Sequence, residues 1–125
     1  MQTVLTDAAP HPAGHYSQGV VHYGVVYVAG QLPIVPGSDD RTVGTMDAQT
    51  EQTLRNVEAV LLACGSSLDR VLQMTIYVSD IEQWGAVNLA YARVMGAHKP
   101  ARAVVPVKEL HYGYQIEIQA VAAVA

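Results

Sequence analysis

Two charged side chains stand within short apolar segments near the end of the chain. Arg102 lies in the segment PARAVV (100–105), and Glu117 lies in QIEIQA (115–120). A charge on an apolar strand needs a counter-ion or a ligand, because burying it unpaired is costly. A guanidinium can bind a carboxylate through two parallel hydrogen bonds, and a carboxylate can accept and return a proton. The two residues are therefore either an internal ion pair or parts of a site for a small acidic ligand.

Alternation along each segment indicates the side that each charge takes. Ile116 and Ile118 are expected to pack under helices, which places Glu117 on the opposite, uncovered face of its strand. Arg102 would face the same region if the alanines on either side of it also pack under the helices. Both interpretations of the pair depend on that placement.

The elements that must carry these residues follow from hydrophobic periodicity. An extended arm is expected over 1–17, and two β-rich runs around Gly24, within 19–30, predict a hairpin. The remaining elements are a helix over 47–63, a strand over 71–78, a helix from the capping-box pattern 79–82 to Gly96, and strands over 101–107 and 115–125. This order predicts one α+β domain over residues 1–125, a sandwich of one sheet with two helices on one face.

Two helices can cover only one face of such a sheet. The other face is expected to present Tyr27, Tyr77, Val104 and Val121, which together are too apolar to stay wet in a stable monomer. A second copy of the chain is the expected partner for this face, so the chain is predicted to be an oligomer.

Composition excludes several classes of protein. The 125 residues include one cysteine, which rules out a disulfide scaffold and a cysteine-built zinc site. The net charge of −4 argues against a nucleic-acid groove. No cation precedes Arg41 and no apolar run reaches membrane-spanning length, so a soluble, cytoplasmic protein is expected. His11 and His15 are four residues apart, but Pro12 and Gly14 prevent the helix that would align them on a metal, so no metal site is expected.

Several short motifs run in order along nearly the whole chain. They are Tyr16-Ser17-Gln18-Gly19, Gly30-Gln31-Leu32-Pro33, Asn56-Val57, Val87-Asn88 with Tyr91, Pro100-Ala101-Arg102, and Lys108, Leu110 and Ile116-Glu117-Ile118. With this order and spacing the chain resembles the reactive intermediate deaminases, the RidA/YjgF family, also called L-PSP.

The resemblance implies a homotrimer of chorismate-mutase-like subunits with a cleft between each pair of neighbours. It also implies a deaminase that needs no cofactor and hydrolyses 2-imino acids of the 2-iminobutanoate and 2-iminopropanoate type, or their enamine tautomers, to 2-keto acids and ammonia. In this view Arg102 clamps the substrate carboxylate, and Glu117 positions a water molecule and moves protons.

Other matched positions imply further roles at the cleft. Tyr16 matches a tyrosine that lines it, and Gly30 matches a glycine whose backbone approaches the ligand closely. Asn88 is expected to be a buried amide, satisfied by backbone, that holds the loops near the cleft. The loop 112–114, with sequence YGY, either edges the cleft or packs the turn.

Three positions depart from the family pattern. Ala29 stands where deaminases often have a serine, Ala103-Val104 replaces the usual Ser-Cys after the arginine, and Gln119 replaces a second glutamate. The family holds its water partly through main-chain groups near Val104, which a valine can also provide. Loss of the hydroxyl and thiol predicts a more apolar pocket.

Two other functions stay open. The chain could be a non-catalytic, regulatory trimer that binds a small carboxylate through Arg102, with Glu117 only a counter-ion. It could also share the endoribonuclease or translation-inhibitor activity attached to some relatives. Arg102 is the only cation expected near the cleft, so the sequence predicts no track of phosphate contacts.

Overall fold

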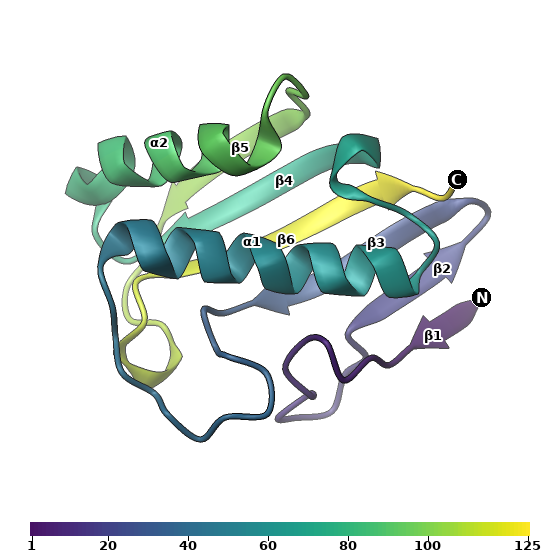
Figure 1. Ribbon diagram of the computed structural model, residues 1–125, viewed down its shortest axis with the longest axis horizontal. Coiled ribbons are helices and arrows are strands. Elements are labelled where there is room, and N and C mark those ends of the chain that lie inside the picture. Colours follow the sequence, from purple (N-terminus) through teal and green to yellow (C-terminus); the bar gives the residue numbers. More distant parts are fainter.

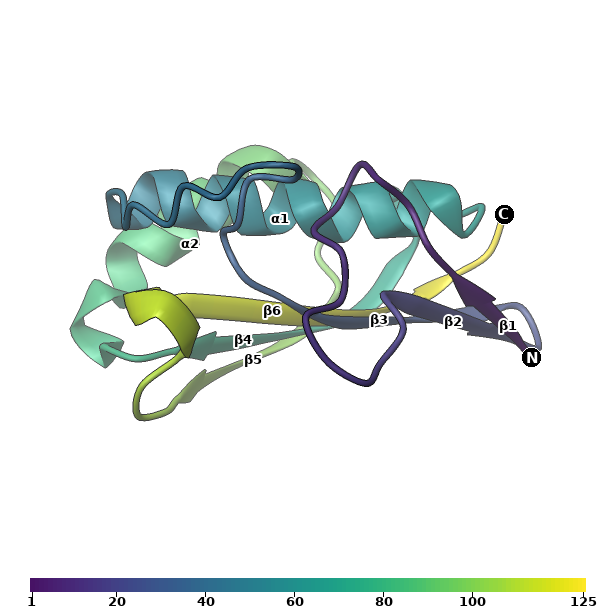
Figure 2. The ribbon, with the colours of Figure 1, turned by 90° about the horizontal axis from the view of Figure 1, so that it is seen from below.

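A twisted sheet lies beneath two helices, and both helices cover the same face of it (Figures 1 and 2). The computed structural model describes residues 1–125. Its strands are β1 (Gln2–Val4), β2 (Gly19–His22), β3 (Val25–Gln31), β4 (Val71–Val78), β5 (Ala101–Pro106) and β6 (Ile116–Ala123), and its helices are α1 (Met46–Ala63) and α2 (Trp84–Met95). Short 3-10 turns, η1 (Leu68–Arg70), η2 (Ile81–Gln83) and η3 (His111–Gly113), join some of them.

The sheet is mixed, with parallel and antiparallel pairs. Its strand order is β1-β2-β3-β6-β4-β5, and only β4 and β5 run parallel. Strand β1 was not predicted: the first residues of the arm pair with β2, with Thr3 opposite Val20. The arm is therefore anchored at its start and free to loop over the sheet only after Val4.

The core lies between α1 and the covered face of the sheet. Helix α1 begins after Thr45, whose side chain accepts a hydrogen bond from the backbone N–H of Ala48. Its apolar stripe, which includes Leu54 and Val57, is fully buried against inward residues of β4 and β6 such as Ile76 and Ile118. None of the helices combines the length and the apolar character that a membrane crossing requires.

Strand β4 departs from simple alternation at its start. Leu72 is 52% exposed, although its spacing from Met74 predicts the covered face. The pairing of β4 with β6 shifts between Val71 and Gln73, and this irregularity turns Leu72 outward and Val71 inward. The alternation holds from Met74 onward.

The entry to the second helix also differs from the prediction. Asp80, not Ser79, provides the cap: its side chain accepts a hydrogen bond from the Glu82 N–H and opens the turn η2. Helix α2 then begins at Trp84.

The edge strand β5 has the opposite orientation to the one expected. In its parallel pairing with β4, Arg102 lies opposite Met74 and Val104 lies opposite Ile76. Paired residues in a sheet point to the same side, and Met74 and Ile76 are buried beneath the helices. Arg102 and Val104 therefore lie on the helix-covered face.

The other face of the sheet, here called the open face, carries no helix (Figure 2). Tyr27 pairs with Val121 on this face, and Tyr77 pairs with Glu117. Tyr27 is 51% exposed. The predicted apolar open face is thus present, with Val104 as the exception.

Candidate functional site

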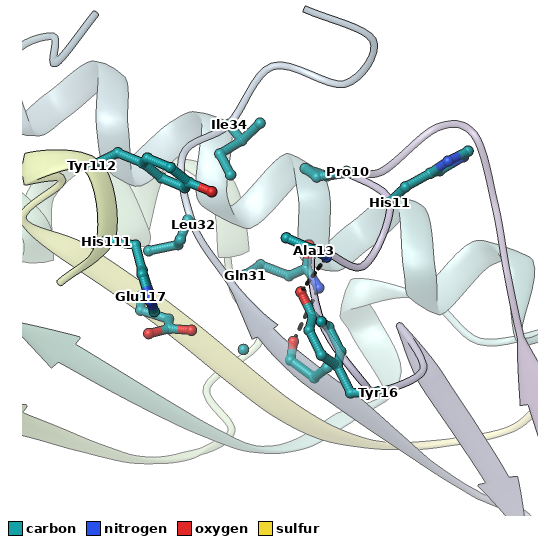
Figure 3. Close-up of a pocket in the computed structure, with 13 residues that line it drawn as sticks. Pro10, His11, Ala13, Tyr16, Gln31, Leu32, Ile34, His111, Tyr112 and Glu117 are labelled. Atoms are coloured by element: carbon teal, nitrogen blue, oxygen red, sulfur yellow. Dashed lines mark hydrogen bonds between the residues drawn. The ribbon is translucent and has the colours of Figure 1, made fainter. Parts of the chain in front are cut away.

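Glu117 lines a cavity of about 510 Å³ at one end of the sheet. Three segments that are far apart in the sequence form its walls (Figure 3). They are the arm from Pro10 to Tyr16, the end of β3 with the segment that follows it (29–34), and η3 with Glu117. Four residues proposed from the sequence, Tyr16, Ala29, Gly30 and Glu117, meet here.

The end of β3 fits closely against Glu117. Between Val28 and Gln31 the pairing with β6 shifts, so Ala29 and Gly30 lie outside the regular ladder. A Cβ atom at Gly30 would lie 3.1 Å from Cδ of Glu117 and closer still to its Oε2. Any side chain at position 30 would therefore push the carboxylate out of its place.

A buried glutamine holds the arm over the cavity. The side-chain Oε1 of Gln18 accepts a hydrogen bond from the Thr6 N–H at 2.7 Å, and its Nε2 donates to the Pro10 carbonyl at 2.8 Å. These bonds close the arm into a loop that carries Tyr16. The Tyr16 hydroxyl in turn accepts a 3.4 Å hydrogen bond from the Ala13 N–H.

A buried asparagine of α1 holds the opposite wall. Nδ2 of Asn56 donates to the carbonyls of Leu32 at 2.9 Å and Ile34 at 2.8 Å. Both bonds fix the segment after β3, which has no strand or helix of its own. The apolar side chains of this segment face the cavity (Figure 3).

Arg102 lies elsewhere, in an aromatic cage formed with α2. Its guanidinium carbon is 4.9 Å from the centre of the Trp84 ring and 4.7 Å from that of Tyr91. Nη1 of Arg102 also donates to Oδ1 of Asn88 at 3.2 Å. Asn88 is exposed, so the prediction of a buried amide satisfied by backbone is wrong: its partner is the guanidinium.

Tyr91 adds to the electrostatics of this cage. Burial raises the pKa of its hydroxyl, and the nearby charge of Arg102 acts in the opposite direction. The hydroxyl is buried and has no hydrogen-bond partner within the chain. The cage therefore offers the guanidinium two aromatic rings and one amide oxygen, but no carboxylate of this chain forms an ion pair with it.

The predicted site residues thus fall into two groups within one chain. Arg102, Asn88 and Val104 belong to the covered side of β5 and α2, whereas Glu117 belongs to the open face of β6. Strand β4 separates the two strands. The expectation that Arg102 and Glu117 share one face is wrong for a single chain, and no ion pair joins them.

Comparisons with known proteins agree with this architecture. The sequence profile of the family described as endoribonuclease L-PSP matches residues 6–124. The chain belongs to this family, which is also known as RidA/YjgF. It is 38% identical to a RutC family protein of Pyrococcus horikoshii, over 97% of this chain and 96% of that protein.

Solved structures of L-PSP proteins superpose on nearly the whole chain. The YjgF gene product of Escherichia coli has a TM-score of 0.93 at 32% identity, with 98% of each chain covered. TdcF of Escherichia coli, whose structure holds bound serine, has a TM-score of 0.94 at 28% identity, with both chains covered in full.

The cage around Arg102 and the cavity at Glu117 also contain residues for which the sequence predicted no functional role. Trp84 stacks on Arg102 and His111 lines the cavity. Tyr112 lines the cavity and Tyr114 is buried, so the loop does both things that were expected of it. The available signal for Trp84 was its position on the same helix face as Tyr91.

Proposed function

We propose that the protein is a deaminase that needs no cofactor and hydrolyses 2-imino acids, of the 2-iminobutanoate and 2-iminopropanoate type, to 2-keto acids and ammonia. One observation carries the proposal. The Arg102 guanidinium lies between two aromatic rings without an ion-pair partner, and the Glu117 carboxylate lines a separate cavity. A substrate with a carboxylate beside an electrophilic carbon needs both groups, and two neighbouring copies of the chain can supply them.

We infer an oligomer from the open face, and the family resemblance implies that it is a homotrimer. Val121 lies on this face in the same strand as Glu117, with Tyr27 of β3 paired to it, and an apolar face of this kind is stable when a second copy covers it. A cyclic trimer would form three equal clefts. In each, Glu117 of one subunit would meet Arg102 of its neighbour.

The reaction follows from the chemistry of the two groups. Arg102 binds the substrate carboxylate through paired hydrogen bonds, and its aromatic cage keeps the guanidinium plane fixed. Water attacks the carbon of the protonated imine while Glu117 accepts one of its protons. That proton then passes to the nitrogen of the carbinolamine; the carbon–nitrogen bond breaks and ammonia leaves as Glu117 takes the hydroxyl proton and the carbonyl forms.

The other functions have less support. The cavity around Glu117 contains no Lys or Arg, which an RNA backbone would require. A non-catalytic binder would need only Arg102. That hypothesis does not explain why the backbone at Gly30 lies so close to the Glu117 carboxylate.

The test combines single variants with their mixture. An amino acid oxidase generates the imine in situ, and semicarbazide traps what has not been hydrolysed, so deaminase activity appears as less semicarbazone. Arg102→Ala and Glu117→Gln should each lower turnover by about a hundredfold or more, with the fold intact by circular dichroism.

If each site takes one group from each of two subunits, mixing the two inactive variants after dissociation should restore about a quarter of wild-type activity, because a random trimer pairs intact groups in that share of its clefts. Restored activity supports the shared site. Near-normal turnover by either single variant would overturn the assignment of that residue, and a wild type that accelerates no imine would overturn the deaminase.

A further inference from the structure

The cavity beside Glu117 is larger than a small imino acid requires. Its volume is about 510 Å³. Cavities of roughly 300–1,000 Å³ suit drug-sized ligands, whereas 2-iminobutanoate has only about seven non-hydrogen atoms. Within the single chain, much of the space is therefore available to a larger group attached to the reacting carbon.

The cavity also has two chemically different ends. Figure 3 shows the Glu117 carboxylate at one end, with Leu32, Ile34 and Tyr112 toward the other; the His111 ring lies beside the carboxylate, and its centroid is 5.9 Å from that of Tyr112. The far end offers carbon surface and the ring of Tyr112; no charged side chain lines the cavity there, and the Arg41 guanidinium stacks on the Tyr112 ring from outside the lining.

The walls of the apolar end are held in place before any ligand binds. The two hydrogen bonds from Asn56 fix the backbone at Leu32 and Ile34. The guanidinium carbon of Arg41 lies 5.3 Å from the centre of the Tyr112 ring, and Nη1 of Arg41 donates to the Ser38 carbonyl at 2.7 Å. A wall fixed in advance loses little entropy on binding, so contacts with it add to affinity.

Tyr112 has a further neighbour that sets its direction. Its ring meets that of Tyr114 edge to face, with centroids 6.2 Å apart, and Tyr114 is buried. Tyr112 itself is half exposed, so its ring does not complete the core. An aromatic side chain fixed in this way at the mouth of a cavity is suited to stacking on another ring.

We propose that this site selects 2-imino acids with bulky apolar side chains, and aromatic ones above all, over the three- and four-carbon imines. The inference rests on the proposed deaminase activity and specifies its substrates. The imine carbon lies near Glu117, and the side chain of the substrate extends past Leu32 to stack on Tyr112. Ala29 also lines the cavity and adds no polar side-chain group to it.

The experiment compares imines made from phenylalanine and from alanine by an amino acid oxidase, after subtraction of spontaneous hydrolysis. Wild type should show a kcat/KM about tenfold or more higher for the phenylalanine-derived imine, since even one methylene in an apolar pocket changes this ratio by about tenfold. Tyr112→Ala should lower the value for the aromatic imine about three- to tenfold. The value for the alanine-derived imine should change less than about twofold, because that substrate does not reach Tyr112.

Tyr23→Ala is the matched control. Tyr23 and Tyr112 are both exposed, both have a positive φ (48° and 63°), and each is followed by a glycine, but Tyr23 lies in the β2–β3 turn outside the cavity. Its removal should leave both rates unchanged. Ile34→Trp, which fills the apolar end, should exclude the aromatic imine and spare the small one.

The outcomes separate the two proposals. Equal rates for both imines, or a preference for the small one, would overturn the selectivity and leave the deaminase standing. If no imine is accelerated, the deaminase fails, and calorimetry with phenylpyruvate and pyruvate then decides the selectivity of the cavity. If phenylpyruvate binds more tightly than pyruvate and Tyr112→Ala abolishes this difference, the selectivity is supported. If the two keto acids bind equally well, the selectivity is overturned.

Discussion

Replacing Gly30 with alanine should displace the Glu117 carboxylate while leaving the fold nearly intact. The new methyl carbon would lie 3.1 Å from Cδ and 3.3 Å from Cγ of Glu117, and closer still to Oε2. The carboxyl group is the end of a flexible side chain and can move away. Gly30 has no positive φ, so the backbone accepts alanine. We therefore expect the free energy of unfolding to fall by about 1 kcal/mol or less.

The effect on turnover should be much larger. A shift of about 1 Å in a catalytic group can cost on the order of a hundredfold in rate. We expect kcat for imine hydrolysis to fall by about that factor in Gly30→Ala, while urea unfolding shows a stable protein.

Gly85→Ala provides the control for adding a methyl group to a glycine. A Cβ at Gly85 in α2 would meet no atom within 4 Å. This variant should keep full turnover and equal or slightly higher stability, because alanine favours a helix. If Gly30→Ala were folded and as active as Gly85→Ala, the Glu117 carboxylate would not act from the position seen here, and its role in proton transfer would be wrong.

Three further predictions concern ligand binding and stability. Trp84 is the only tryptophan and stacks on Arg102, so titration with 2-ketobutyrate should change the tryptophan fluorescence. Arg102→Ala should abolish that change. Binding seen by calorimetry without a fluorescence response would contradict the role of Arg102 in binding the carboxylate. Asn56→Asp replaces a donor with a carboxylate facing two carbonyls and should lower the free energy of unfolding by about 1–3 kcal/mol in urea; unchanged stability would show that this bond pair is not needed. Burial raises the pKa of Cys64 above its ordinary value of 9.0, so above pH 9 the unfolded thiol loses its proton while the folded one keeps it, and stability falls as pH rises. Cys64→Ala should show a smaller loss of stability between pH 8 and pH 10, and an equal loss would assign it to other groups.

Most of the fold could be predicted because its long elements carry a clear period. The helix expected over 47–63 is α1 (Met46–Ala63), and the strand expected over 71–78 is β4 (Val71–Val78). Strand β1 was missed because three residues give no period, and its pairing depends on β2. The outward turn of Leu72 was missed because a shift in register depends on the partner strand.

The placement of Arg102 shows a different limit of the sequence. In the segment 100–105 small alanines flank the arginine, so neither side of the strand is clearly apolar, and alternation alone does not decide which side is covered. The parallel pairing with β4 decides it, since Arg102 lies opposite buried Met74. The flat faces of Trp84 and Tyr91 then make the covered side acceptable for a guanidinium, because aromatic rings attract cations.

This placement changes how the family pattern is understood for this chain. Had Arg102 and Glu117 shared one face, they could neutralise each other, and a substrate would have to break that ion pair to bind. On opposite sides of the sheet, with β4 between their strands, they have no such contact. In the proposed reaction the guanidinium would therefore keep, for a substrate carboxylate, the donors that Asn88 does not use, and the Glu117 carboxylate would be free to accept a hydrogen bond from water. In the proposed trimer, assembly would place the substrate between Arg102 of one subunit and Glu117 of its neighbour. The separation of the two groups within each subunit would then keep both of them free to contact that substrate.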